Sequence, residues 1–276
     1  MKRRDVIAAS SGFSALALTA LSGSVSKTLA ASPQPTKGQN VQLDKDLTGY
    51  YVTPSGKGQS PAVIVIMEAF GLNDYIKSVC DRLAQAGYAA LAPDFYHSAV
   101  YSYTDMNGAI AKLKTLKDDV VMAELGKGIE FLGKRSEVQG GGVGVMGFCM
   151  GGRYTFLANA VQAAQVKAAV SFYGGGIAAN PDPLGRANLL SQVDKMSAPI
   201  MLMYGAEDKS ISAEEHQQVA AALSKAKKRY ALNVFPKAGH GFFRDRRDSY
   251  NPDASAEAWA MTLSFFDRHL KGKKII

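Results

Sequence analysis

The segment that most constrains the fold is residues 143–152, which read VGVMGFCMGG. It starts as a short apolar strand, turns sharply between glycines and continues into the helix-forming sequence RYTFLA. The pattern within it is G-x-C-x-G, with Cys149 at the strand-to-helix turn. We expect Gly147 and Gly151 to be required, because the backbone comes too close at these positions to admit a side chain. The segment therefore predicts a buried strand joined directly to a helix.

Cys149 is a candidate nucleophile because that helix would point its N-terminus at the sulfur. A helix N-terminus carries partial positive charge and free N–H groups, which favour a thiolate and later an oxyanion. The alternative is a buried, inert cysteine in a glycine-rich turn, since free Cys is among the most buried residue types. A base and an orienting acid elsewhere in the chain would favour the first interpretation.

Short apolar runs alternate with amphipathic helical patterns along the chain. Helices are expected over about 74–87, 119–133, 213–227 and 253–270. Strands are expected at 62–67, 88–92, 166–173, 199–204 and 230–235, with an edge hairpin formed by 41–43 and 49–53. This alternation predicts an α/β fold with a mostly parallel central sheet and helices on both faces. Residues 97–117 and 178–198 lack a clear pattern and are expected to border a cleft.

The N-terminal residues 1–31 have the features of an export signal. Arg3 and Arg4 form a twin arginine, a mildly apolar stretch follows, and small residues surround Ala31. This pattern predicts a twin-arginine-type signal peptide, cleavage near Ala31 and a periplasmic location. The alternative, an N-terminal helix or anchor, fits less well because the apolar stretch is short and interrupted by polar residues. A polar linker at 32–40 and a single domain at 41–276 are expected to follow.

The two cysteines are not expected to form a disulfide. Cys80 falls on the apolar side of an amphipathic helical pattern, which is typical of a core residue. A bond between Cys80 and Cys149 would also abolish the nucleophile. The formal net charge of +8 comes without a tight basic tract in the globular part, so nucleic-acid binding is not indicated.

An acid and a histidine follow two of the predicted strands directly. Asp208 follows the strand at 199–204, and His240 follows the strand at 230–235. Because parallel strands end at one edge of the sheet, both side chains should lie near Cys149. The order nucleophile, acid, base is that of α/β-hydrolases. By itself Asp208 could be a helix N-cap and His240 a loop residue, but their positions together favour a catalytic set.

Four segments together resemble the dienelactone hydrolase family of the α/β-hydrolase fold, over nearly all of residues 41–270. They read GFCMGG from Gly147, MEAFGLN from Met67, YAALAPDFY from Tyr88 and GHGF from Gly239. The first two match the family's cysteine elbow and its E-x-F-G-x-N loop. The resemblance implies a carboxymethylenebutenolidase-like hydrolase without a cofactor or a metal.

The resemblance also implies further catalytic groups. Glu68 would hydrogen-bond the resting thiol and assist its deprotonation when substrate arrives. The backbone N–H groups of Met150 and Ala69 would form the oxyanion hole.

Substrate contacts are implied as well. Arg244 would hold a substrate carboxylate, and Tyr96 would lie beside the substrate. Ser98 stands where the family has a second basic residue.

The residues together predict a hydrolase of small esters or lactones that acts through a Cys149 acyl-enzyme. The expected partner is a small-molecule ester or lactone that can carry an anionic group, and the protein is expected to be a monomer without a membrane partner after signal removal. One alternative is a non-catalytic binding protein on a hydrolase scaffold, which would need a broken catalytic set. Another is a thioesterase or peptidase of the same fold, since pocket shape decides which bond is cleaved.

Overall fold

The computed structural model describes residues 38–56, 58–179, 182, 184–245 and 247–272. The signal peptide predicted at 1–31 lies outside these residues. Strand β1 begins at Gln39, inside the range 32–40 that was expected to be a linker. The folded domain therefore starts slightly earlier than residue 41.

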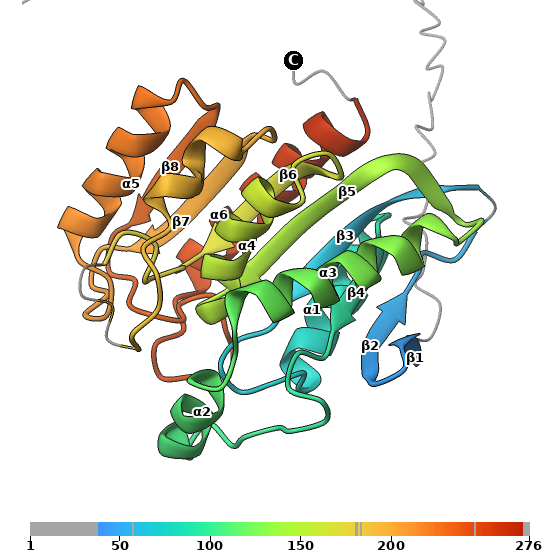
Figure 1. Ribbon diagram of the computed structural model, residues 1–276, viewed down its shortest axis with the longest axis horizontal. Helices are drawn as coiled ribbons and strands as arrows, with labels where there is room; N and C mark the ends of the chain where they lie inside the picture. The colour runs from blue at the N-terminus through green and yellow to red at the C-terminus, as the bar shows by residue number, and fades with distance from the viewer. Residues whose placement is uncertain (1–37, 57, 180–181, 183, 246, 273–276) are drawn as a thin grey trace, which may run out of the picture. The chain divides into compact units, whose positions relative to one another are not determined.

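The strands of the described residues form one mixed sheet in the order β1-β2-β4-β3-β5-β6-β7-β8 (Figure 1). The pairs β1/β2 and β2/β4 are antiparallel, and the remaining neighbours are parallel. This confirms the mostly parallel sheet with an antiparallel hairpin at one edge. The strands are β1 (Gln39–Asp44), β2 (Leu47–Val52), β3 (Ser60–Ile66), β4 (Ala89–Pro93), β5 (Val138–Phe148), β6 (Val166–Phe172), β7 (Ile200–Gly205) and β8 (Tyr230–Phe235).

Helices cover both faces of this sheet, as the sequence predicts (Figure 1). Helices α1 (Asp74–Gln85) and α6 (Pro252–Leu270) share one face, where the Arg82 guanidinium of α1 lies 4.2 Å from the Trp259 ring centroid of α6. Helices α3 (Asp118–Gly133) and α4 (Met150–Val161) pack together on the other face.

Shorter elements lie in or beside the segments for which no pattern was found. Helix α2 (Met106–Leu113) lies within 97–117, and a 3-10 helix, η1 (Leu190–Lys195), lies within 178–198. The remaining helix, α5 (Ala213–Lys225), is capped by Ser212, whose side chain accepts from the Glu215 N–H.

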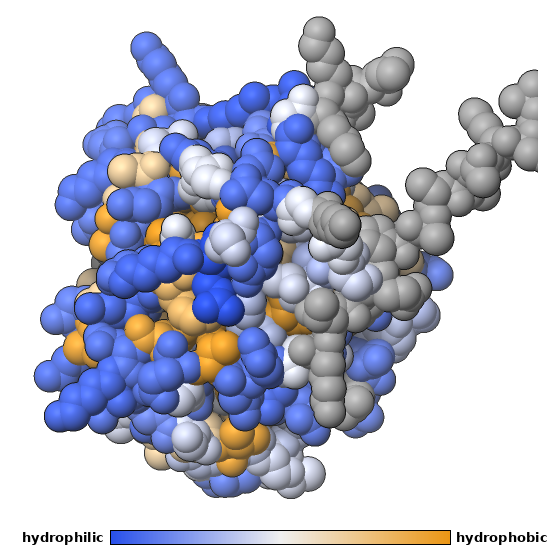
Figure 2. All heavy atoms as spheres, turned by 90° about the vertical axis from the view of Figure 1, so that its right-hand side faces the viewer, coloured by the Kyte–Doolittle hydropathy of each residue, from blue (hydrophilic) through white to orange (hydrophobic). Residues whose placement is uncertain are grey.

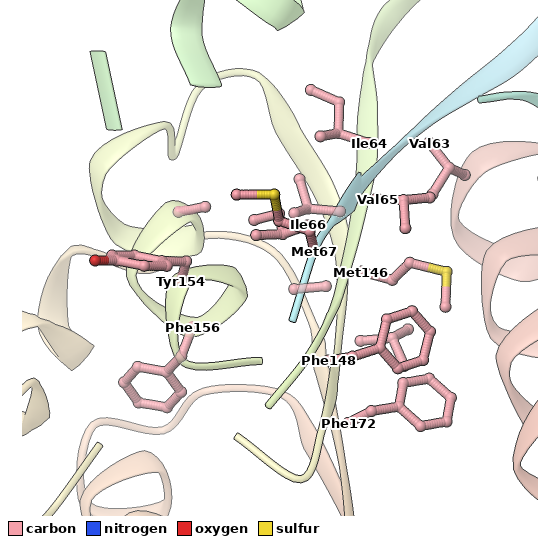
Figure 3. Packing of buried hydrophobic residues seen from close by; sticks show 14 of the residues in the cluster. Val63, Ile64, Val65, Ile66, Met67, Met146, Phe148, Tyr154, Phe156 and Phe172 are labelled. Atoms are coloured by element: carbon pink, nitrogen blue, oxygen red, sulfur yellow. The ribbon is translucent and has the colours of Figure 1, made fainter. Parts of the chain in front are cut away.

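Strand β3 is buried on both sides, which explains its unbroken run of apolar residues. Figure 3 shows Ile64 and Ile66 on the side of helix α4, with Tyr154 and Phe156, while Val63 and Val65 lie on the opposite side. Successive side chains of a strand point to opposite faces, so each face of β3 contributes to a separate packed layer. The two packed layers hold the carboxyl end of β3 in place, and Glu68 follows that end.

One face of the molecule is mainly hydrophilic, with hydrophobic residues in small separate areas (Figure 2). None of the helices in the described ranges combines the length and the apolar character that crossing a bilayer requires.

Candidate active site

Cys149 occupies the sharp turn between β5 and α4, with φ 54° and ψ −114°. Its N–H donates to the Phe172 carbonyl at 3.0 Å, which ties the turn to β6. A Cβ on Gly147 would lie 2.2 Å from the Gly151 carbonyl oxygen, and one on Gly151 would lie 2.3 Å from the Ile66 carbonyl oxygen. Both contacts are with backbone atoms, which cannot move aside as a flexible side chain can. The steric reason predicted for the two glycines is therefore confirmed.

Cys149 opens into a cavity of about 670 Å³. Its sulfur-bearing side chain is partly buried, whereas Cys80 is fully buried in the core, and both thiols are free. The core position predicted for Cys80 is thus confirmed, and the predicted absence of a disulfide agrees with the structure. Apolar side chains make up much of the wall: Phe70, Met106, Ile110, Leu113, Leu184 and Ile211. Such a cavity suits a small organic ligand.

Asp208 and His240 meet at the same edge of the sheet. Asp208 follows β7, His240 follows β8, and the imidazole Nδ1 lies 2.8 Å from Asp208 Oδ2. The other carboxylate oxygen accepts from the N–H groups of Ser210 and Ile211, at 2.8 and 3.2 Å. Because Ser212 caps α5, Asp208 is not the helix cap that its position allowed. The carboxylate is instead buried and held in one orientation toward the ring.

The His240 imidazole also interacts electrostatically with the Cys149 side chain. Burial by itself would lower the pKa of the imidazole. The interactions of the ring with Cys149 and Asp208 outweigh this effect and raise the pKa of His240 to about 10. The arrangement therefore favours the protonated form of the His240 imidazole. A histidine beside a cysteine can take a proton from the thiol and later give it to a leaving group.

The two residues expected to form the oxyanion hole line the same cavity as Cys149. Met150 is the first residue of α4, so its N–H has no acceptor within the helix. Ala69 follows β3 after two residues, and both Met150 and Ala69 line the cavity. Their positions suit donors to an oxyanion that forms when the sulfur attacks a carbonyl.

The surroundings of Glu68 differ from the expectation that it hydrogen-bonds the resting thiol. Its Oε2 lies 2.8 Å from Arg244 Nη1, and Tyr173 Oη donates to Oε1 at 3.5 Å. Glu68 is almost fully buried, so a cationic partner offsets the cost of its desolvated charge. The carboxylate is held by these partners rather than by the sulfur of Cys149. Its participation in deprotonation stays a prediction.

The residues predicted to contact substrate lie behind the cavity wall. Arg244 is fully buried, and its role as a carboxylate contact stays a prediction. Tyr96 is also buried, with its hydroxyl 3.7 Å from the Met150 sulfur. The Ser98 N–H donates to Asp94 Oδ2 at 2.6 Å, and Ser98 is not among the residues that line the cavity.

Several residues of the site have no local sequence signal. Tyr173 packs its ring 5.2 Å from the His240 ring, and burial raises its pKa well above the usual value. Arg153, also fully buried, makes a bidentate pair with Asp118 at 2.7 and 2.8 Å. An arginine four residues after Cys149 is the one hint of this pair in the sequence.

The sequence places His216 in no catalytic pattern, which predicts a surface position, and the structure shows that this prediction is wrong. It is buried and stacks on Tyr204 with ring centroids 3.9 Å apart. Burial lowers the pKa of His216, which favours its neutral form. His216 lies on the face of α5 that packs against Tyr204 of β7. Helical spacing alone did not reveal that β7 covers this face of the helix.

The comparison with known proteins covers most of the chain. The model of the "Dienelactone hydrolase family" matches residues 47–270. A Synechocystis protein named as a carboxymethylenebutenolidase is 34% identical over 84% of this chain and 94% of its own length. A relative of the same name from Methylorubrum extorquens is 30% identical over 98% of this chain and 94% of its own length.

The fold agrees with that of a solved relative. The crystal structure of a Klebsiella pneumoniae protein named as a dienelactone hydrolase superposes with a TM-score of 0.78 at 28% identity, over 85% of this chain and 99% of its own. The match in sequence family and in fold extends across the elbow, the Glu68 loop and the His240 loop. The chain therefore belongs to the dienelactone hydrolase family.

Proposed function

We propose that this protein hydrolyses small carboxylic esters or lactones by forming an acyl-enzyme at Cys149. Family membership supports ester or lactone hydrolysis. Two relatives that match this chain over most of their own length are named as carboxymethylenebutenolidases. The observation that carries the mechanism is the strained elbow, which directs Cys149 into a cavity beside a His240 that is held by Asp208.

In the proposed reaction His240 takes the proton of the Cys149 thiol, and the sulfur attacks the carbonyl carbon. The oxygen of the resulting tetrahedral intermediate is stabilised by the N–H groups of Met150 and Ala69. As the intermediate collapses, the carbon–oxygen bond to the leaving group breaks, and His240 donates its proton to that oxygen. Water, deprotonated by His240, then attacks the thioester and releases the acid and the free Cys149.

Asp208 has a supporting role in this scheme. It accepts from the Nδ1–H of His240, which fixes the tautomer that presents Nε2 to the sulfur and the leaving group. It also stabilises the charged imidazolium. We further propose that Glu68 assists thiol deprotonation, which requires its ion pair with Arg244 to open.

The test is a screen of small esters and lactones with the protein lacking residues 1–31 and with its Cys149→Ala variant. We expect turnover by the first protein and none above background by the second. Iodoacetamide should alkylate Cys149 much faster than the buried Cys80 and should abolish activity in parallel. Full activity after complete labelling of Cys149 would contradict the proposal.

A further inference from the structure

A second cavity, of about 560 Å³, lies where strands β7 and β8 begin. Pro199 and Met201 line it from the start of β7, and Arg229 and Tyr230 line it from the start of β8. The residues proposed for catalysis follow the opposite ends of these two strands. In the described part of the chain, the two cavities have no lining residue in common. The second cavity is therefore a separate site.

One side of the C-terminal half of α6 forms the facing wall of this cavity. Met261, Phe265 and Arg268 line it, at intervals of four and three residues along the helix. Residues with this spacing lie on one side of a helix. Met261 and Phe265 pack on the hydrophobic core but are only partly buried. Part of their apolar surface is therefore open to a ligand.

Cationic side chains gather at this cavity without a counter-ion. Arg229 and Arg268 are exposed, and neither forms an ion pair with any residue in the described ranges. Burial lowers the pKa of His269, and the positive charges of Arg229 and Arg268 lower it further. The three side chains are thus close enough to interact. No Asp or Glu of the described residues lines the cavity.

The end of helix α6 explains only part of this cluster. Arg268 and His269 occupy its last turn, where the partial negative charge of the helix C-terminus stabilises cations. Arg229 directly precedes β8, so the helix end does not account for its presence. Its approach adds repulsion between like charges, which costs free energy. An anion between the two guanidinium groups would remove that cost.

We propose that this cavity binds a small aromatic carboxylate. Arg229 and Arg268 hold the carboxylate through charge-assisted hydrogen bonds. The neutral imidazole of His269 has one N–H that can donate another. The rings of Tyr230 and Phe265 contact the aromatic body, and the Phe265 and His269 rings already meet edge to face with centroids 4.6 Å apart. The site does not depend on the hydrolase function proposed above.

The test uses 2-naphthoate as the probe and 2-naphthamide as its neutral analogue of similar shape. Both are titrated into the full chain and into the double variant Arg229→Gln with Arg268→Gln. The NMR signals of the His269 ring report binding at this cavity, and those of the His240 ring report binding at the catalytic one. The affinity for 2-naphthoate at His269 should fall by about tenfold or more in the double variant. Equal affinities of the two proteins would overturn the proposal.

The analogue and a simple anion test the chemical class of the ligand. In the unaltered protein 2-naphthamide should bind at His269 more weakly than 2-naphthoate, because it cannot pair with a guanidinium. Equal affinity for the two compounds would refute a carboxylate site. Inorganic phosphate that binds as tightly as 2-naphthoate would refute the aromatic part of the proposal, since the apolar wall would then contribute nothing.

The matched control is the double variant Lys45→Gln with Lys114→Gln. Both lysines are exposed and lie outside the cavity, and the pair of changes removes the same net charge. Its affinity for 2-naphthoate at His269 should equal that of the unaltered protein. An equal loss in both double variants would show a general effect of net charge and would contradict a specific site.

A further variant separates this site from the proposed catalysis. Cys149→Ala should bind 2-naphthoate at His269 with unchanged affinity, because Cys149 lines only the other cavity of the two. That result would hold even if no ester is turned over by the unaltered protein. Loss of binding at His269 in Cys149→Ala would overturn the independence of the two sites.

Discussion

At the scale of single residues, the site depends on a backbone conformation that non-glycine residues rarely adopt. Cys149 has φ 54° and ψ −114°, and such strain costs about 1–3 kcal/mol. The surrounding structure maintains it through the Cys149 N–H bond to Phe172 and through the absence of side chains at Gly147 and Gly151. The strain places the sulfur next to His240 and at the cavity instead of inside the core.

The first prediction concerns the pKa of His240. In Cys149→Ala it should fall from about 10, because the charge and the hydrogen bond of the sulfur are removed. A side-chain NMR titration of both proteins measures this, and the remote His269 should titrate identically in the two. An unchanged midpoint for His240 would show that no charged sulfur is coupled to it.

The same shift has a consequence for stability, with a definite sign. The pKa of His240 in the folded protein is raised above the ordinary value of 6.5, so the folded state holds its proton more tightly. The stabilisation is complete below about pH 6.5 and is lost as the pH rises through about 10. Urea unfolding from pH 6 to pH 10 should therefore show a steeper fall for the unaltered protein than for Cys149→Ala.

The second prediction is that Gly151→Ala destabilises the protein by at least about 2 kcal/mol, because the new Cβ would meet the Ile66 backbone at 2.3 Å. Thermal and urea unfolding measure this effect. The control is Gly133→Ala at the end of α3, where nothing lies within 4 Å of the new Cβ. That change should be neutral or stabilise by up to about 1 kcal/mol. Equal effects of the two substitutions would contradict the steric explanation.

At the scale of elements, helix α4 both presents its N-terminus to the sulfur and anchors the loop beyond β6. Arg153 in its first turn binds Asp118 of α3 and donates to the carbonyls of Gly176 and Ala187 at 3.1 and 2.9 Å. Gly176 lines the cavity. One buried guanidinium therefore joins the elbow helix, its neighbour α3 and a wall of the site.

The third prediction is that Asp118→Asn lowers the free energy of unfolding by about 2–3 kcal/mol, because it leaves the fully buried Arg153 without its charged partner. The control is Glu130→Gln, which breaks the exposed pair with Lys134 on the same helix. That pair should contribute much less to stability, because water and salt screen an exposed ion pair. Urea unfolding of both variants measures the difference, and equal losses would contradict a special role for Arg153.

At the scale of the whole domain, the parallel sheet gathers residues that are far apart in sequence. Strands β3, β5, β7 and β8 run in one direction, so the residues that follow them meet at one edge. These residues are Glu68, Cys149, Asp208 and His240. Helix α2 then supplies an apolar wall from the segment between β4 and α3.

The fourth prediction is that residues 1–31 direct export by the twin-arginine route and are removed. The mature protein should be periplasmic and should begin near Ser32, as N-terminal sequencing of that fraction would show. Changing both Arg3 and Arg4 to Lys should leave the protein in the cytoplasm with Met1 retained, because this route reads the arginine pair. Lys27→Gln is the control and should not affect export. Periplasmic delivery of the double variant would contradict the prediction.

Much of the architecture could be predicted because its determinants are local. A continuous β-branched run such as 62–67 predicts a strand buried on both faces. Asp208 and His240 could be placed beside Cys149 because the strands before them are parallel, and the structure brings the three together. The structure of segments 97–117 and 178–198 could not be predicted from the sequence. Residues of both segments line the cavity, and this depends on tertiary packing rather than on a local pattern.

The sequence by itself determined the class of fold, the elbow and the edge of the sheet at which the polar residues meet. Each follows from hydrophobic periodicity or from the steric needs of a tight turn, which act within a few residues. Only the tertiary structure decided that Glu68 pairs with Arg244, 176 residues away, and that Arg247 lines the cavity. Charge pairing depends on distance in space and on burial, and neither is encoded by spacing along the chain.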